Sequence, residues 1–260
     1  MSERDIFESL KDLPLSEVRF YPETGSTNQD ALDWADQGAP DLALIIADHQ
    51  TAGRGRLGRS WFTPPGAALA FSLILRPAQP QPDLLPLYSP LGALGVAIAL
   101  EQIYGLQPLI KWPNDVLLNQ RKVCGVLAET LWQGDVLQAV VVGIGINVAP
   151  ASVPPADQVL FPATCVEDAV GTMVNRWQLL AEVLKTVIYW HNLLTTPSFF
   201  AAWQQRLAFK GEKVRLENTG GETFEGILLG INSFGHLRLQ MDVGGEKTFS
   251  IGDLKLRPLS

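Results

Sequence analysis

The sequence predicts an α+β protein: a mixed β-sheet with flanking helices, followed by a small C-terminal β-barrel. Two observations lead to this prediction. Up to residue 208, apolar runs of strand length alternate with longer runs that have the apolar spacing of helices. From residue 209 on, five short strand candidates follow one another closely, separated by turns rich in glycine and asparagine, as in small barrels. We therefore expect two domains, residues 1–208 and 209–260.

The first part of the larger domain alternates predicted helices and strands. A short helix is expected within residues 1–15, and the amphipathic run 29–37 predicts a second one. Strands are predicted at the apolar runs 18–21, 42–47 and 67–75.

Small polar residues stand directly before the second helix. Ser26, Thr27 and Asn28 are residue types that cap helix N-termini. The same hydroxyls, together with the backbone N–H groups of a helix start, can also hold a polar ligand. Both interpretations remain open at this point.

A long buried helix, 91–104, follows a proline-rich connection, and its alanines and glycines favour close packing. Pro113 breaks the next predicted strand, 110–116, because proline cannot continue a central ladder. The rest of this domain is predicted to hold strands within 121–130 and 139–148 and helices at 174–194 and 199–208. The barrel strands are expected at 213–216, 223–229, 237–240, 247–250 and 253–257.

Residues 49–61 form the most basic stretch, with Arg54, Arg56 and Arg59 interleaved with glycines directly after a predicted strand. Glycines let backbone N–H groups turn toward a ligand, and guanidinium groups bind phosphate or carboxylate in bidentate fashion. Because neighbouring cations repel, we expect this loop to order around an anion. A solvated basic loop, or a segment that contacts nucleic acid, explains these residues equally well.

Polar residues and glycines also interrupt apolar strands. Asn114 and Asp115 follow the strand break and either project toward a cleft or form an ordinary turn. Lys122 stands at a strand entry, usually the place of a solvated edge residue. Gly143 and Gly145 lie within a strand, which indicates close approach of a ligand to the backbone.

Composition excludes several classes of protein. The net charge of −7 over 260 residues argues against general affinity for nucleic acid, which needs a broad basic surface. Cys124 and Cys165 are far apart, so neither a disulfide framework nor a cysteine zinc site is expected. The start lacks a signal peptide, and the longest apolar run, 91–100, is shorter than the about 20 residues that span a bilayer. We therefore expect a cytoplasmic protein that binds neither membrane nor DNA.

Five motifs together resemble the biotin protein ligases, also called biotin–[acetyl-CoA carboxylase] ligases. In chain order they are Gly-Ser-Thr-Asn at 25–28, the basic loop at 50–59, Lys-Trp-Pro-Asn-Asp at 111–115, Lys122-x-x-Gly125, and Gly-Ile-Gly-Ile-Asn at 143–147. The resemblance implies a catalytic domain related to class II aminoacyl-tRNA and lipoyl synthetases, followed by an SH3-like barrel. The lipoate ligases fit less well, because they lack this combination of the basic loop and the Lys-Trp-Pro-Asn-Asp motif.

The resemblance also implies what this chain does. Regulatory members carry a DNA-binding winged helix before the Ser-Thr-Asn motif, which here begins at residue 26, so the short, purely enzymatic form is expected. Biotin and Mg·ATP would give biotinyl-5′-AMP and pyrophosphate, and a carrier lysine would then take the biotinyl group. The implied carrier is the biotin carboxyl carrier protein of acetyl-CoA carboxylase. Exposed edge strands leave a homodimer open.

Site residues follow from the resemblance, position by position. The implied catalytic residues are Lys122, Arg56 and Asp115, where Asp115 either holds Mg²⁺ or orients the incoming lysine. The residues expected at biotin are Ser26, Thr27, Asn28, Gln50, Gly53, Arg54, Gly55, Arg56, Lys122, Gly125, Gly143 and Gly145. The residues expected at ATP are Arg54, Arg56, Arg59, Trp61, Lys111, Asn114 and Asn147, although Trp61 is equally well explained as a core aromatic.

Overall fold

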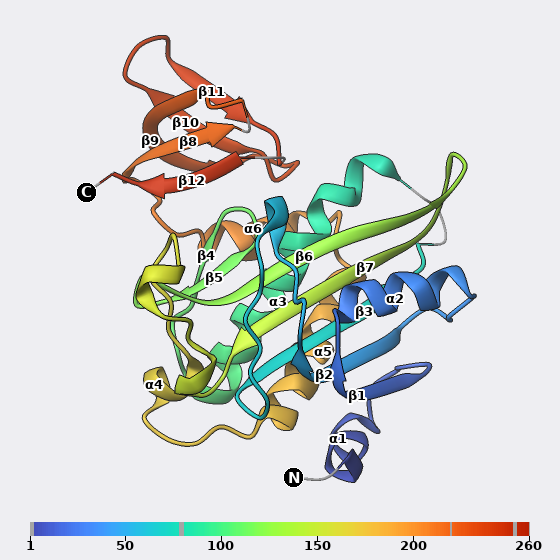
Figure 1. Cartoon of the computed structure of the whole chain (residues 1–260). Coiled ribbons are helices and arrows are strands. Elements are labelled where there is room, and N and C mark those ends of the chain that lie inside the picture. Colours follow the sequence, from blue (N-terminus) through green and yellow to red (C-terminus); the bar gives the residue numbers. More distant parts are fainter. Residues whose placement is uncertain (1–2, 78–80, 219, 252–253, 260) are drawn as a thin grey trace.

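The computed structural model describes residues 3–77, 81–218, 220–251 and 254–259. Within them, a seven-stranded mixed sheet with helices on both faces is followed by a five-stranded antiparallel sheet (Figure 1). The large sheet has the strand order β1-β2-β3-β7-β6-β5-β4. Its strands are β1 (Val18–Thr24), β2 (Ala43–Gln50), β3 (Ala68–Leu75), β4 (Leu109–Lys111), β5 (Asp115–Leu118), β6 (Arg121–Gln133) and β7 (Val136–Asn147).

Different helices cover the two faces of this sheet. Along β2, Leu44 belongs to the main core with α3 (Tyr88–Tyr104) and α5 (Arg176–His191), whereas Ile45 packs with α2 (Thr27–Asp36) on the other face. Successive side chains of a strand point to opposite faces. A strand covered on both sides must therefore be apolar throughout, which is why the central strands are continuous apolar runs.

The connection through α2 places two polar segments next to each other. Strands β1 and β2 are parallel, with α2 as the crossover between them, and the register pairs Thr24 with Gln50. The start of α2 and the end of β2 therefore lie at the same end of the sheet. All other neighbouring strands of this sheet are antiparallel.

Helix α3 is the central helix of the main core. By length and composition, the stretch Pro82–Tyr104 is the one described segment that could cross a membrane, but 72% of its most apolar window is buried inside the protein. It packs on β6, β7 and α5, as expected for a core helix. The helix starts three residues earlier than predicted, because Pro90 lies in its first turn, where a missing N–H breaks no helical bond.

The C-terminal sheet has the strand order β11-β10-β9-β8-β12. Its strands are β8 (Lys213–Asn218), β9 (Thr223–Ile231), β10 (Leu237–Met241), β11 (Glu246–Phe249) and β12 (Leu254–Pro258). In Figure 1 it lies next to α6 (Pro197–Gln205), at the edge of the large sheet that β4 and β5 form. Two hydrogen bonds fix this position: Trp112 Nε1 donates to the carbonyl of Gly235 at 3.1 Å, and Ile231 N donates to Gln204 Oε1 at 2.7 Å.

The predicted elements recur in the structure with shifted ends, and one α-helix is additional. The strand predicted at 110–116 is a hairpin, β4 and β5, with a turn at the cis Trp112–Pro113 bond. Helix α4 (Val166–Val170) lies in a stretch with no predicted element, because five residues are too few for a periodicity to show. At the N-terminus, α1 (Glu3–Leu10) falls inside the predicted range. Residue 253, the predicted start of the last strand, lies outside the described residues.

Candidate functional site

Two adjoining cavities lie where the ends of β2, β5, β6 and β7 meet the arginine loop, which we define as residues 51–61. The smaller has a volume of about 100 Å³ and the larger of about 620 Å³, and both are bordered by Gln50, Arg59, Trp61 and Asp115, among others. Every predicted site residue lines one or both of them. Two of the predicted residues, Gly53 and Asn147, line only the larger cavity.

Close backbone packing shapes the arginine loop. Trp61 N donates to the Gly53 carbonyl at 2.8 Å, and Gly55 N donates to the Arg59 carbonyl at 2.7 Å, so the loop folds back on itself as a narrow hairpin. A Cβ at Gly53 would lie 2.5 Å from the carbonyl oxygen of Trp61, closer than real Cβ atoms come. Glycine at this position is therefore required by the loop's own fold, independently of any ligand.

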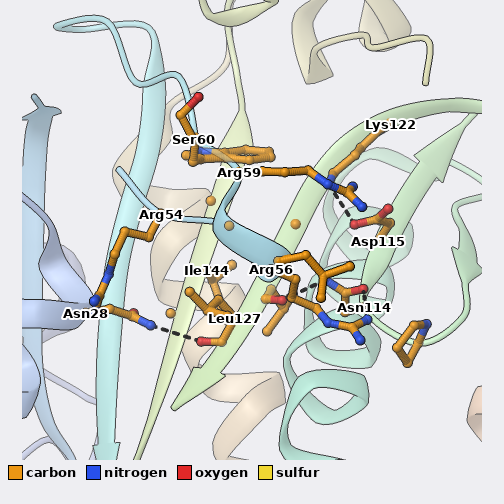
Figure 2. A pocket seen from close by; sticks show the side chains of 18 of the residues that line it. Asn28, Arg54, Arg56, Arg59, Ser60, Asn114, Asp115, Lys122, Leu127 and Ile144 are labelled. Atoms are coloured by element: carbon orange, nitrogen blue, oxygen red, sulfur yellow. Dashed lines mark hydrogen bonds and ion pairs between the residues drawn. The ribbon is translucent and has the colours of Figure 1, made fainter. Parts of the chain in front are cut away.

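Protein side chains already engage two of the loop's arginines. Arg54 Nη2 lies 2.9 Å from Glu129 Oε2. Arg56 Nη1 donates to Asn114 Oδ1 at 3.0 Å, as Figure 2 shows. Arg59 extends toward Lys122 and Asp115. The repulsion that the sequence predicts among the arginines is thus relieved by separate partners for Arg54 and Arg56.

Asp115 lies between two lysines at the centre of the site. Its Oδ1 is 2.7 Å from Lys122 Nζ, and its Oδ2 is 3.2 Å from Lys111 Nζ. Burial alone would raise the pKa of Asp115, but the charges and hydrogen bonds of Lys122 and Lys111 outweigh it and hold this pKa well below its ordinary value. Burial also lowers the pKa of Lys111, with Asp115 opposing that effect. Asp115 is therefore a carboxylate at neutral pH.

The cavities are strongly cationic. Among the described residues that line them, Asp115 is the one anionic side chain, whereas six are cationic: Arg54, Arg56, Arg59, Lys111, Lys122 and Arg257. Arg257 comes from β12 of the C-terminal sheet, and its pKa is lowered first by burial and then by the neighbouring charge of Arg59. Such an arrangement binds a polyanion, because each cation gains a counter-charge.

Paired glycines form a flat surface under Trp61. Gly125 and Gly145 are opposite each other in the register of β6 and β7. The Trp61 indole lies directly over Gly145, where a Cβ would overlap the ring, and a Cβ at Gly125 would come within 3.1 Å of it. Within the described structure, the buried Trp61 Nε1 has no hydrogen-bond partner, so its N–H is available to an acceptor brought by a ligand.

A neutral polar network lies beside this surface and reaches the start of α2. We call Thr27, Asn28, Gln50, Thr63 and Ser72 the polar network. Gln50 Oε1 accepts from Thr27 N at 2.9 Å, and Gln50 Nε2 donates to Thr63 Oγ1 at 3.1 Å. Ser72 Oγ lies 2.9 Å from Thr27 Oγ1 and 2.6 Å from Asn28 Oδ1. Ser26 is the N-cap residue of α2, but its side chain makes no capping hydrogen bond.

Sequence reasoning missed several lining residues. From the sequence, Arg257 is only the end of a predicted barrel strand, and Phe161, whose ring centroid lies 5.1 Å from Lys111 Nζ, lies outside every predicted element. Ser72 was read as one residue of an apolar strand. An isolated hydroxyl inside a fully buried strand is the one local signal that could have drawn attention to Ser72.

Comparison with known proteins identifies the family. The sequence profile of the Biotin/lipoate A/B protein ligase family matches residues 21–147. The bifunctional ligase/repressor BirA of Bacillus spizizenii is 34% identical, over 98% of this chain and 79% of the relative. The chain belongs to the biotin protein ligase family. The biotin–[acetyl-CoA-carboxylase] ligase of Paracoccus denitrificans is 39% identical to this ligase, over 86% of this chain and 94% of the relative.

Solved structures agree with this placement. The biotin protein ligase from Aquifex aeolicus in complex with biotin and ATP superimposes on this ligase with a TM-score of 0.81, at 31% identity, over 94% of this chain and 100% of that one. The predicted fold class is thereby confirmed, and the chain is a ligase enzyme. The individual roles of the site residues remain predictions.

Proposed function

We propose that this ligase joins biotin to a specific lysine of a carrier protein in two ATP-dependent steps. In the first, a carboxylate oxygen of biotin attacks the α-phosphorus of ATP, which gives biotinyl-5′-AMP and releases pyrophosphate. In the second, a deprotonated lysine amine attacks the acyl carbon, an amide forms, and AMP leaves. The observation that carries the proposal is a cationic cavity directly adjoining a neutral polar network.

This juxtaposition suits the two halves of the intermediate. The excess of cations around Asp115 favours a triphosphate, and it also offsets the repulsion between that triphosphate and the biotin carboxylate. The polar network offers amide and hydroxyl groups without charge, which match a neutral cyclic urea. We assign biotin to the smaller cavity and ATP to the larger one, with Trp61 between them.

Lys122 and Asp115 have separate roles in this proposal. Lys122 lines both cavities, so its charge would stabilise the negative charge that develops on the carboxylate and α-phosphate oxygens. Asp115 pairs with both lysines and holds them in place, and in the second step it is the one carboxylate among the described lining residues that could orient the incoming amine.

Mg²⁺ is assigned to the substrate Mg·ATP. No group of three or more His, Cys, Asp or Glu side chains that could hold a metal occurs among the described residues. Both oxygens of Asp115 already face lysine ammonium groups. Magnesium is commonly held by phosphate oxygens and water with only one or two protein carboxylates, so this site fits a metal that arrives on the nucleotide.

Pyrophosphate exchange into ATP tests the first step directly. The purified ligase, Mg·ATP and labelled pyrophosphate should give biotin-dependent exchange, with lipoate as the competing acid. A biotin carboxyl carrier domain should then take up the biotinyl group on one lysine, seen as a mass increase. Exchange with lipoate but not with biotin would overturn the substrate assignment. Tight biotin binding without any exchange would overturn the enzymatic proposal.

A further inference from the structure

The polar network ends on a carboxylate that lines neither cavity. Glu129, on β6, accepts a hydrogen bond from Asn28 Nδ2 at 2.7 Å through Oε2. The same oxygen lies 2.9 Å from Arg54 Nη2 of the arginine loop. One atom thus joins Asn28, a buried residue of the network, to the arginine loop. Sequence analysis gave no role to Glu129.

We propose that Glu129 is a positioning residue for biotin, acting through Asn28 and Arg54; the proposal rests on the assignment of biotin to the smaller cavity. Both Nδ2 hydrogens of Asn28 are engaged, one by Glu129 and one by the Leu127 carbonyl at 3.1 Å. A carboxylate can only accept, so it forces the NH₂ side of the Asn28 amide toward β6.

This orientation propagates to Thr27. The Asn28 oxygen is left facing Ser72 Oγ at 2.6 Å, and because an amide oxygen can only accept, the single hydrogen of Ser72 is directed to Asn28. The Thr27 hydroxyl then keeps a lone pair open toward the cavity that it lines. A hydroxyl in that state accepts from a ligand N–H, which is what the urea of biotin presents.

The second contact holds the arginine loop over the cavity. Arg54 also donates to Gln29 Oε1 at 3.2 Å, so the guanidinium lies between α2 and β6. The Arg54 and Glu129 side chains are 37% and 28% exposed, so the pair adds little to the stability of the fold, and its effect is local. Without Glu129, the loop loses the one ion pair that joins it to β6 among the described residues, and the Asn28 amide is free to turn over.

Variants at Glu129 separate this role from a merely structural one. We expect Glu129→Ala to raise the biotin Kd about tenfold or more, the loss that one charge-assisted hydrogen bond represents, with the Kd of a non-hydrolysable ATP analogue changed less than about twofold. Glu129→Gln keeps an acceptor oxygen without the charge, so its biotin Kd should lie between those of the wild type and of Glu129→Ala. Glu225→Gln, which removes one carboxylate charge 2.6 Å from Arg215 in the C-terminal sheet, is the matched control.

Trypsin cleavage of the ligand-free ligase gives a readout independent of activity. Loss of the Arg54 contact should speed cleavage within the arginine loop in Glu129→Ala and not in Glu225→Gln. In an Arg54→Gln background, Glu129→Gln should add no further cleavage, because both changes remove one pair. A biotin Kd and a cleavage rate within about twofold of wild type for Glu129→Ala would overturn the inference. If wild type binds no biotin, the proposed function fails, and cleavage alone still decides whether Glu129 holds the loop.

Discussion

The substitution Gly143→Ala tests whether the polar network depends on a missing side chain. Gly143 lies on β7, opposite Ser72 of β3 and Leu127 of β6. A Cβ at this position would overlap Asn28 Oδ1 and come within 2.6 Å of Asn28 Cγ. The Asn28 amide would have to retreat by roughly 1.5 Å to reach ordinary van der Waals contact.

The size of the effect follows from the bonds that this movement breaks. The Ser72–Asn28 hydrogen bond of 2.6 Å cannot survive it, and the bonds from Asn28 Nδ2 to Leu127 and Glu129 would be displaced. Each buried polar group left without a partner costs about 1–3 kcal/mol. Because the amide oxygen and the amide nitrogen are both affected, we expect the free energy of unfolding to fall by about 2–6 kcal/mol. Alanine also restricts the unfolded chain, which reduces this loss by up to about 1 kcal/mol.

Urea unfolding at pH 7 measures this loss, and titration calorimetry measures the accompanying decrease in biotin affinity, expected to be at least about tenfold. Gly25→Ala is the stability control, because a Cβ there meets nothing within 4 Å. The decisive comparison adds Gly143→Ala to Asn28→Ala. If the overlap with Asn28 is the cause, the second change costs little once Asn28 is gone. Fully additive losses, or wild-type stability of Gly143→Ala, would refute the reasoning.

Three further predictions concern the charged residues. Lys122→Ala should lower kcat for adenylate formation about 10²- to 10³-fold while the chain still folds, since Lys111 keeps Asp115 paired; near-normal single-turnover rates would contradict that role. Arg56→Gly should increase release of biotinyl-5′-AMP, measured as biotin attached to a bystander protein, because it removes the 3.0 Å link between the loop and Asn114; unchanged labelling would count against it. Asp115→Asn should lose on the order of 3 kcal/mol of stability at pH 7. Because the folded-state pKa of Asp115 lies below its ordinary 3.8, its stabilisation is complete above that pH and lost below it. The difference between wild type and variant in urea should therefore shrink on going from pH 7 to pH 3, and a constant difference would exclude this origin.

Local patterns predicted most of the fold because its strands are covered on both faces. Strands such as β2 and β3 are nearly continuous apolar runs, and such runs are visible without knowledge of the partner strand. The predicted ends of the elements were less accurate than their positions. Helix α3 starts before its predicted first residue, because its first turn includes a proline. From the sequence, the glycines of β7 are interpreted as points where a ligand approaches the backbone. In the structure, however, the approaching groups are the side chains of Asn28 and Trp61.

Site residues were predictable where a motif concentrates them, and not where the fold alone brings them together. Arg257 reaches the cavities only because the C-terminal sheet docks through Trp112 and Gly235, which are more than a hundred residues apart. Glu129 looks ordinary in its strand, and the isolated hydroxyl of Ser72 gives no indication of its partner. Their importance comes from Asn28, which contacts both, and no pattern within one strand encodes a contact between strands and a distant helix.

The arrangement of charge explains how a ligand-free ligase can keep so many cations in one place. Lys111 is buried, and burial by itself favours its neutral form. Asp115 opposes that tendency for Lys111 and binds Lys122 at the same time, while Glu129 neutralises Arg54 at the far side of the loop. Two carboxylates are therefore enough to stabilise the cationic site before the nucleotide arrives, yet too few to neutralise it. The surplus charge remains for the phosphates, and the uncharged polar network beside it remains for the neutral cyclic urea that we propose it binds.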